Sequence, residues 1–417
     1  MFPDTIKLQR YRCFAEEQTL PVRRLTLIYG ENNTGKSALV RLLPLLADSC
    51  EPRSPSPLST RSKAMRDGSL RNLFSNRARR DMALELGWGK ESVRYVFAVE
   101  DEGDRDRGVI ERCELRLRGE TIAAATRTLS SGAPDGATHT WTFADGTPTV
   151  QGAFRGLVPV TDGNTPPQLL AAWNARMSKL AGAVQWLHAR RAPLPTSDTR
   201  QAGDIWLLDP DGRDVIQLLS AQPTVAARVG DWFGKHEKAV FAVSSDLRST
   251  EASLTLTIPP GASFNLVDGS EGLQFTVPVL AALGVLASEA LGAPSVLALE
   301  EPEGHLHGRL QRALAEEIID VVERTPSARV IIETHSPIFL TAMQLAVARA
   351  RRAPPRDGAL PLRAGDVALC LAERDGAACS LRTVTLDDGG APTSGEFVDF
   401  FSEEHTITLD LQREREG

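Results

Sequence analysis

The sequence predicts an α/β protein with a mainly parallel core sheet, an antiparallel β subdomain and an inserted helical lobe. Three observations predict this fold class. Strand-like and helix-like segments alternate from residue 271 to residue 350, which is typical of a parallel sheet. Residues 81–145 place apolar side chains at every second position, as antiparallel strands do. Residues 166–236 place them at helical spacing instead.

Composition limits the function. The net charge of −7 argues against a protein that coats nucleic acid, so such a contact would need a local basic patch. The five cysteines form no C-x-x-C pair, which favours reduced thiols in a cytoplasm. The N-terminus lacks the apolar run of a signal peptide, and Val277–Ala287, the longest apolar run, is too short to span a membrane. We therefore expect a soluble, cytoplasmic protein without membrane contact.

The elements of the chain can be assigned in order. Short strands in "TIKLQRY" and "RLTLIYG" precede a helix in "KSALVRLLPLLA", and the Pro- and Ser-rich residues 51–63 predict a loop. After the central region, alternation returns in "SLTLTI". The C-terminal part predicts a helix from 271, strand 295–299, helix 305–323, strand 328–333, helix 336–350, and two strands after 366. The predicted domains are an N-terminal part with the antiparallel subdomain (1–150), an inserted α-rich lobe (151–262), a C-terminal part of the same α/β unit (263–350), and strands with an acidic tail (351–417).

The stretch "GENNTGKS", residues 30–37, fits the pattern G-x-x-x-x-G-K-[ST] between a strand and a helix. Backbone N–H groups of such a loop surround phosphates, and the helix N-terminus adds its dipole. Lys36 would reach the β- and γ-phosphates and Ser37 would bind Mg²⁺. A glycine-rich turn without a ligand is the alternative, which the flanking strand and helix disfavour. The predicted nucleotide-binding residues are Gly30, Glu31, Asn32, Asn33, Thr34, Gly35, Lys36, Ser37 and Ala38.

A second motif supplies acidic residues. "SVLALEE" reads as a strand buried on both faces that ends in Glu300 and Glu301. Glu300 would lie on the Mg²⁺ side, whereas Glu301 points the other way and could orient or deprotonate the attacking water. A third strand, "ARVIIETHS", ends near His335, which could touch the γ-phosphate. The predicted catalytic residues are therefore Lys36, Glu301 and His335, and the predicted metal-binding residues are Ser37 and Glu300.

The order of these motifs resembles the ABC-type P-loop NTPase head, and in particular the RecF/SMC-like and OLD-like (overcoming lysogenization defect) AAA-type ATPases. The similarity lies in "EEPEGHLHG" and "ETHSPIFL" and covers residues 1–47 and 265–345. It implies that two copies enclose two ATP molecules with Mg²⁺. It also implies that His335 is a switch histidine, and that Glu303, His305 and His307 lie in a loop facing the opposite protomer.

Two departures from the family pattern bear on the dimer. Where transporter-type ATPases carry their signature, this chain has "DGSEGLQFTVP", so that Ser270, Gly272 and Gln274 would be the contacts to the opposite nucleotide. Glu271 among them is unfavourable beside a γ-phosphate unless it bonds to backbone amides. Gly308 also stands where the family usually has proline. The long insert between Lys36 and Glu300 contains no heptad run, so we expect a globular arm or dimer-contact lobe.

Other candidate sites have simpler explanations. A zinc site at His305 and His307 would need further ligands, and no cysteine lies near them in sequence. A Toprim nuclease needs a D-x-D in an additional domain; the only such triplets, residues 104–106 and 209–211, read as turns. Two arginine groups could bind nucleic acid, although charge runs usually face solvent; they are Arg71, Arg77, Arg79 and Arg80, and Arg349, Arg351, Arg352 and Arg356.

The resemblance implies an Mg²⁺-dependent ATPase whose ATP-driven homodimer, or higher oligomer, regulates a separate effector protein in anti-phage defence. A nuclease is one candidate effector, and nucleic acid stays open as a partner. The first alternative is a RecF-like DNA-binding ATPase of repair or recombination. The second is the ATPase subunit of an ABC transporter, which the altered signature and the large insert disfavour.

Overall fold

The computed structural model describes most of the chain, with gaps. The residues outside the description are 1, 55, 67, 78–79, 103–104, 130–136, 162–166, 200–204, 246–249, 352–358 and 394–417. The acidic tail and Arg79, Arg352 and Arg356 of the arginine groups therefore lie outside the described residues.

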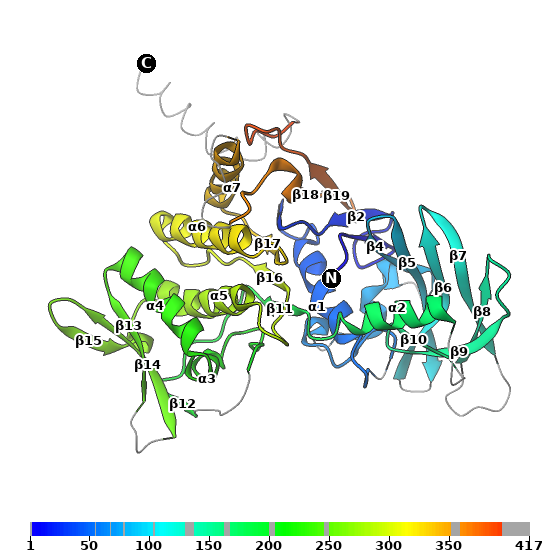
Figure 1. The fold of residues 1–417 in the computed structure, drawn as a ribbon, viewed down its shortest axis with the longest axis horizontal. Coiled ribbons are helices and arrows are strands. Elements are labelled where there is room, and N and C mark those ends of the chain that lie inside the picture. The colour runs from blue at the N-terminus through cyan, green and yellow to red at the C-terminus, as the bar shows by residue number, and fades with distance from the viewer. Residues whose placement is uncertain are drawn as a thin grey trace.

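A six-stranded sheet forms the centre of the described structure (Figure 1). Its strands in spatial order are β11 (Val184–Leu187), β16 (Val296–Glu300), β17 (Arg329–Glu333), β3 (Leu25–Gly30), β18 (Val367–Asp375) and β19 (Ala378–Val384). Neighbouring strands from β11 to β18 run parallel, and β19 is antiparallel to β18. The continuously apolar sequences of β3 and β16 explain their position, because such a strand must be covered on both faces.

Helices cover both faces of this sheet. Helix α1 (Lys36–Asp48) packs on the face that carries Val296, Ala298 and Ile331. The opposite face, with Leu297 and Leu299, packs on α5 (Glu271–Ser288), α6 (Gly308–Arg324) and α7 (Pro337–Ala350). Because side chains alternate along a strand, Glu300 and Glu333 extend on the same face as α1.

A nine-stranded antiparallel sheet covers the outer side of α1 (Figure 1). Its strands, in spatial order among the described residues, are β10 (Val158–Thr161), β9 (Val150–Arg155), β8 (Ala137–Phe143), β7 (Glu120–Leu129), β6 (Arg105–Leu117), β5 (Glu91–Glu102), β4 (Met82–Trp88), β1 (Thr5–Gln9) and β2 (Gln18–Pro21). The alternation in residues 81–145 thus produces antiparallel strands, as the sequence predicts. Helix α2 (Gln168–Ser178) packs beside β10.

The inserted lobe is smaller and contains more β-structure than the sequence predicts. Its helices are α3 (Val215–Ala221) and α4 (Pro223–Glu237), and its sheet consists of β12 (Asp198–Thr199), β13 (Val240–Ser245), β14 (Glu251–Ile258) and β15 (Ala262–Asn265). The predicted boundary at residue 151 is wrong, because β9 pairs with β8 and β11 joins the core sheet. The boundary at 351 is wrong as well, since β18 pairs with β3 and so belongs to the core.

Helix α5 is the only helix of the described residues that is long and apolar enough to cross a membrane. Its 18-residue window has a mean hydropathy of 1.4 and is 72% buried within the protein. It packs on α4, α6 and β16, as a central helix of a packed core does.

Candidate nucleotide-binding site

The loop between β3 and α1 depends on two glycines. Gly30 has a φ of +148°, and a Cβ there would lie 2.3 Å from the carbonyl oxygen of Ala372 in β18. Gly35 has a φ of +90°, and a Cβ there would lie 2.5 Å from the sulfur of Cys13. Side chains at these positions would be both strained and obstructed, so the loop needs glycine at both. The exposed residues Glu31–Asn33 form its tip.

Lys36 begins helix α1 and turns back over the loop. Its side chain is buried, and Nζ donates hydrogen bonds to the carbonyl oxygens of Gly30 (2.9 Å) and Glu31 (2.7 Å). Burial lowers the pKa of Lys36, and the nearby carboxylates of Glu333 and Glu301 oppose that shift. The first N–H groups of a helix lack partners in the helix itself, and in α1 the N–H of Ala38 donates to the carbonyl oxygen of Gly35 in this loop. The arrangement is therefore suited to bind an anion at the mouth of the loop.

Glu333, which the sequence analysis did not single out, lies against Ser37. The Ser37 hydroxyl donates to Glu333 Oε1 over 2.8 Å. Glu333 Oε2 is buried and has no hydrogen-bond partner among the described residues. Burial and the neighbouring Glu300 raise the pKa of Glu333 to about 7, while the Ser37 hydroxyl and Lys36 act in the opposite direction. A carboxylate oxygen without a partner beside a serine hydroxyl is a donor set that suits Mg²⁺, which usually takes few protein oxygens.

Glu300 bonds to two side chains of the core, Arg41 and Trp186. Arg41 of α1 donates from Nε to Oε1 (2.7 Å) and from a terminal nitrogen to Oε2 (2.6 Å). The indole N–H of Trp186 in β11 also donates to Oε1, over 3.1 Å. The Arg41 fork thus occupies both oxygens of Glu300, and Ser37 bonds to Glu333, while the role of Glu300 on the Mg²⁺ side stays a prediction.

Glu301 follows the end of β16 and adopts a φ of +44°, a conformation that non-glycine residues rarely take. Its N–H donates to the carbonyl oxygen of Glu333 over 2.8 Å. Arg191 stabilises this turn by donating to the carbonyl oxygens of Glu300 (3.0 Å) and Glu301 (3.4 Å). Burial lowers the pKa of Arg191 to about 10 despite the nearby glutamates. The turn directs Glu301 away from the Arg41–Glu300 pair, and its half-buried side chain influences the pKa of Lys36.

His335 is positioned by Glu303. Glu303 Oε1 accepts hydrogen bonds from the Thr334 hydroxyl (2.5 Å) and from the N–H groups of His335 (2.9 Å) and Ser336 (3.2 Å). Glu303 is buried and bonds within its own chain, so among the residues of the loop that the resemblance places opposite a second protomer it lies on the inner side. Partial desolvation and the nearby Lys36 lower the pKa of the exposed His335, which favours the neutral imidazole.

His305 and His307 remain exposed but have separate surroundings. His305 Nδ1 lies 3.7 Å from Glu271 Oε2, and its ring meets Phe275 edge to face. His307 accepts from the N–H of Arg309 and caps α6. No group of three His, Cys, Asp or Glu side chains within the described residues could hold a metal ion, so the zinc interpretation gains no support.

The residues before α5 divide into exposed and internal ones. Ser270 and Glu271 are exposed at the helix start. Gly272 is buried, and a Cβ there would lie 2.5 Å from the carbonyl oxygen of His305. Gln274 is also buried and donates to the carbonyl oxygens of Val267 (2.9 Å) and Gly269 (3.1 Å). Gly272 and Gln274 therefore have close contacts within their own chain, and their contacts to an opposite nucleotide stay a prediction.

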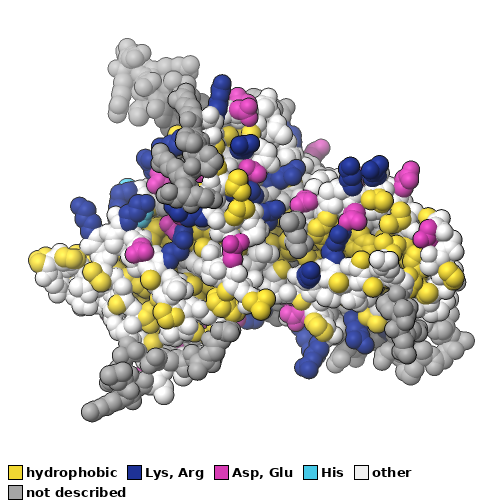
Figure 2. All heavy atoms as spheres, viewed as in Figure 1, with side chains coloured by type: hydrophobic (Ala, Val, Ile, Leu, Met, Phe, Trp, Pro, Cys, Tyr) yellow, Lys and Arg dark blue, Asp and Glu magenta, His cyan; other side chains and the backbone are white. Residues whose placement is uncertain are grey.

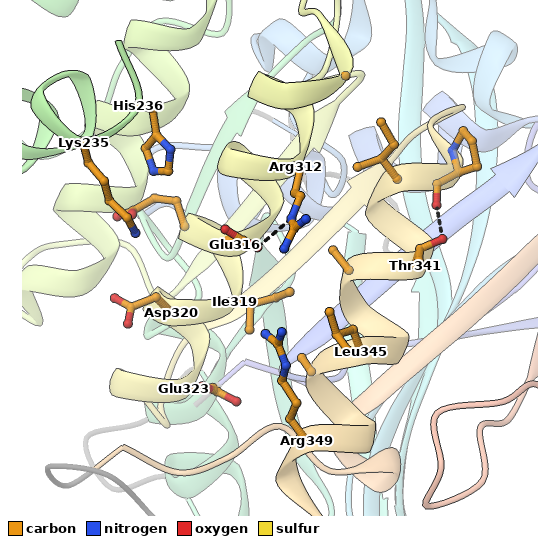
Figure 3. A pocket seen from close by; sticks show the side chains of 16 residues that line it. Lys235, His236, Arg312, Glu316, Ile319, Asp320, Glu323, Thr341, Leu345 and Arg349 are labelled. Carbon is orange, nitrogen blue, oxygen red and sulfur yellow. Dashed lines mark hydrogen bonds and ion pairs between the residues drawn. The ribbon is translucent and has the colours of Figure 1, made fainter. Parts of the chain in front are cut away.

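The arginine groups do not form one basic surface. Arg71 pairs with Asp106 at 2.7 Å, which neutralises it. On the face that Figure 2 shows, Lys and Arg side chains are interspersed with Asp and Glu over α6 and α7. A groove of 920 Å³ lies between these helices and the end of α4, away from the P-loop. Figure 3 shows Arg349 and the acidic Asp320 and Glu323 around its apolar floor, so the groove carries both charges.

The fold and the site together define an α/β protein with a mainly parallel core sheet and a P-loop-type loop between β3 and α1. The P-loop strand β3 is separated from the acidic strand β16 by β17, and all three end at the same edge of the sheet. Residues 258–341 match a family model described as "AAA domain, putative AbiEii toxin, Type IV TA system". This segment contains Glu300, Glu301 and His335 but not the P-loop. A search of curated proteins found no match.

Solved structures similar to the chain include SMC heads. One is an SmcHead bound to the C-winged helix domain of ScpA, with 9% identity, a TM-score of 0.49, and coverage of 93% of this chain and 99% of that one. The SMC head domain from Thermotoga maritima has 10% identity, a TM-score of 0.40, and coverage of 92% and 98%. An Smc head with an extended coiled coil, bound to the C-terminal domain of ScpA derived from Pyrococcus furiosus, has 7% identity, a TM-score of 0.46, and coverage of 99% of both chains.

Proposed function

We propose that the chain is a cytoplasmic, Mg²⁺-dependent ATPase whose ATP-bound form dimerises. The observation that carries the proposal is the convergence of Lys36, Ser37 and Glu333 at one edge of the sheet, with Glu301 and His335 on the adjoining turns. A phosphate-binding loop, a metal-side carboxylate and a second acidic group for water are the parts that phosphoryl transfer to water requires.

The residues of the chain would act by position and charge. Lys36 would exchange its bonds to Gly30 and Glu31 for phosphate oxygens and neutralise their charge. Glu301 would orient the attacking water. Glu303 accepts from the backbone N–H of His335 and so fixes the main chain that carries the imidazole, which would donate to the γ-phosphate. Ser37 and the unpartnered oxygen of Glu333 fit Mg²⁺, which supplies further charge neutralisation when bound with the nucleotide.

The proposed dimer contact includes three exposed residues, Ser270, Glu271 and His305. Ser270 and Glu271 lie at the start of α5. His305 lies in the loop that begins with Glu301, and this loop contacts the start of α5. Two copies facing each other there could each complete the other's site. The lobe of α3, α4 and β12–β15 would then take an orientation set by ATP, which an effector protein could read. Anti-phage defence, with a nuclease as one candidate effector, is the setting we propose.

A RecF-like DNA-binding ATPase is the second candidate, with weaker support. Arg71 of the N-terminal arginine group is paired with Asp106, which neutralises its charge toward a nucleic acid. A transporter subunit has less support still, because Gly272 and Gln274 of the signature-like segment are used inside their own chain.

Phosphate release from ATP tests the proposal. The wild type should hydrolyse ATP with Mg²⁺, and Glu301→Gln should slow hydrolysis by about two to four orders of magnitude, as expected when a positioned base is lost. Glu120→Gln, at an exposed position in β7 far from the P-loop, is the matched control and should hydrolyse ATP at the wild-type rate. Wild-type protein that binds no nucleotide would refute the proposal.

A further inference from the structure

Glu300 and Glu333, the buried glutamates at the ends of β16 and β17, differ in how many hydrogen bonds their carboxylate oxygens accept. Glu300 is 1% exposed, and its oxygens accept three hydrogen bonds, two from Arg41 and one from Trp186. The Arg41 guanidinium also lies over the Trp186 ring, 6.0 Å from its centroid. To serve a metal ion, Glu300 would have to leave a buried, bidentate ion pair and strand Arg41 without its counter-charge, which is costly in a protein interior.

Glu333, in contrast, accepts only one hydrogen bond within the described residues. It is 4% exposed, Oε1 accepts one hydrogen bond from Ser37, and Oε2 has no partner among the described residues. A buried carboxylate oxygen without a partner is rare in native proteins and indicates a missing ligand, water or ion. The hydroxyl that it touches belongs to Ser37, the residue of the P-loop motif that binds Mg²⁺.

The sheet order explains why Glu333 has this position. β17 lies between β3 and β16, so Glu333 stands one strand nearer to the P-loop strand than Glu300, at the same level. Neighbouring strands are about 4.8 Å apart, and it is Glu333 that accepts from the Ser37 hydroxyl. Glu300, one strand farther away, instead meets Arg41 on the next turn of α1.

We propose that Glu333, together with Ser37, is the carboxylate on the Mg²⁺ side of the site, and that Glu300 is a positioning residue that fixes α1 to β16 and β11 through Arg41 and Trp186. The proposal rests on the proposed function, since it assigns the metal-side residue of that nucleotide site. It reassigns the role that sequence order alone gives to Glu300.

Metal binding tests this assignment without hydrolysis. Mn²⁺, which replaces Mg²⁺ and is visible by electron paramagnetic resonance, is titrated into protein holding a non-hydrolysable ATP analogue. Glu333→Gln should weaken Mn²⁺ binding about tenfold or more, in the range seen when groups that hold metal ligands are lost. Its affinity for the analogue without metal should stay within about twofold of wild type, because Lys36 is untouched.

Glu300→Gln is the matched comparison, because it makes the same chemical change one strand away. It should lower the thermal unfolding midpoint and weaken Mn²⁺ binding less than Glu333→Gln does. Glu333→Asp keeps the charge but shortens the side chain, and it serves if Glu333→Gln does not fold; weakened Mn²⁺ binding is expected there too. Wild-type Mn²⁺ affinity in the Glu333 variants would overturn the assignment while leaving the proposed function standing. Failure of the wild type to bind the analogue would overturn both.

Discussion

The P-loop side of the site and the α5 side differ in how much of their chemistry one chain completes. Lys36 and Glu333 are each 4% exposed and bonded within the chain. The side chains of Glu271 and His305 are 72% and 61% exposed and share only a 3.7 Å contact. The first side is thus preorganised within one chain, whereas the second would become part of a site only in the dimer that we propose. Substitutions on the two sides should therefore depend differently on protein concentration.

The largest effect is expected on the P-loop side. Lys36→Ala removes the buried ammonium that the loop carbonyls now hold, so the affinity for an ATP analogue should fall about a hundredfold or more, as charge-assisted phosphate contacts are lost. Equilibrium binding of a fluorescent analogue measures it, at any protein concentration. Lys90→Ala, at an exposed hairpin turn, is the control. An unchanged affinity of Lys36→Ala for the ATP analogue would show that the P-loop does not bind the nucleotide.

The second-largest effect is expected at Glu301, whose substitution should alter both hydrolysis and dimerisation. Glu301→Gln should bind ATP normally but accumulate as a dimer, because the step that opens the dimer follows hydrolysis. Light scattering after size-exclusion chromatography, with ATP and with ADP, measures the mass. A monomer with both nucleotides would contradict ATP-driven association.

A smaller effect is expected where α5 begins. Gly272→Ala places a Cβ 2.5 Å from the carbonyl oxygen of His305, and this overpacking should cost about 1–3 kcal/mol of unfolding free energy. Gly304→Ala is a close control, since its nearest neighbour would be 3.4 Å away, an ordinary contact. Denaturant unfolding of the two variants gives the difference. Equal stability of both would show that the α5 and His305 backbones can separate easily.

The smallest effect concerns Glu271. Because its side chain is exposed and its contact with His305 is a surface one, Glu271→Gln should change stability by less than about 0.5 kcal/mol. Nucleotide affinity at low protein concentration should also stay unchanged. The concentration at which the rate per chain rises should shift, because removing a negative charge beside an opposing nucleotide favours association. Steady-state hydrolysis over a range of protein concentrations measures this shift, and an unshifted curve would place Glu271 outside the dimer contact.

The sequence predicts the local part of this structure well. Strand, loop and helix around Gly30–Ser37 follow from one contiguous pattern, and the elements from Glu271 to Ala350 follow from alternating periodicity. The sequence does not indicate strand β11, because "AVQWL" continues the helical spacing of α2 and its pairing with β16 is non-local. The same holds for the lobe, whose short strands pair with one another across intervening loops.

The site could be predicted only where sequence neighbours share a role. Lys36 and Ser37 follow from one motif, but Arg41 and Glu300 are 259 residues apart and meet only because α1 packs on β16. Glu333 could have been found from strand alternation, since it ends β17 as Glu300 ends β16 and the two lie in register. The internal roles of Glu303 and Gln274 follow from turns that no sequence spacing describes.

Phosphate release from ATP by the purified wild-type chain, measured with and without Mg²⁺ over a range of protein concentrations, tests the central claim most directly. We expect release that requires Mg²⁺. The rate per chain should rise with protein concentration, because in the proposed dimer one chain supplies the P-loop side and the second chain the α5 side. No release in the presence of Mg²⁺, or equal release by Lys36→Ala, would contradict the account.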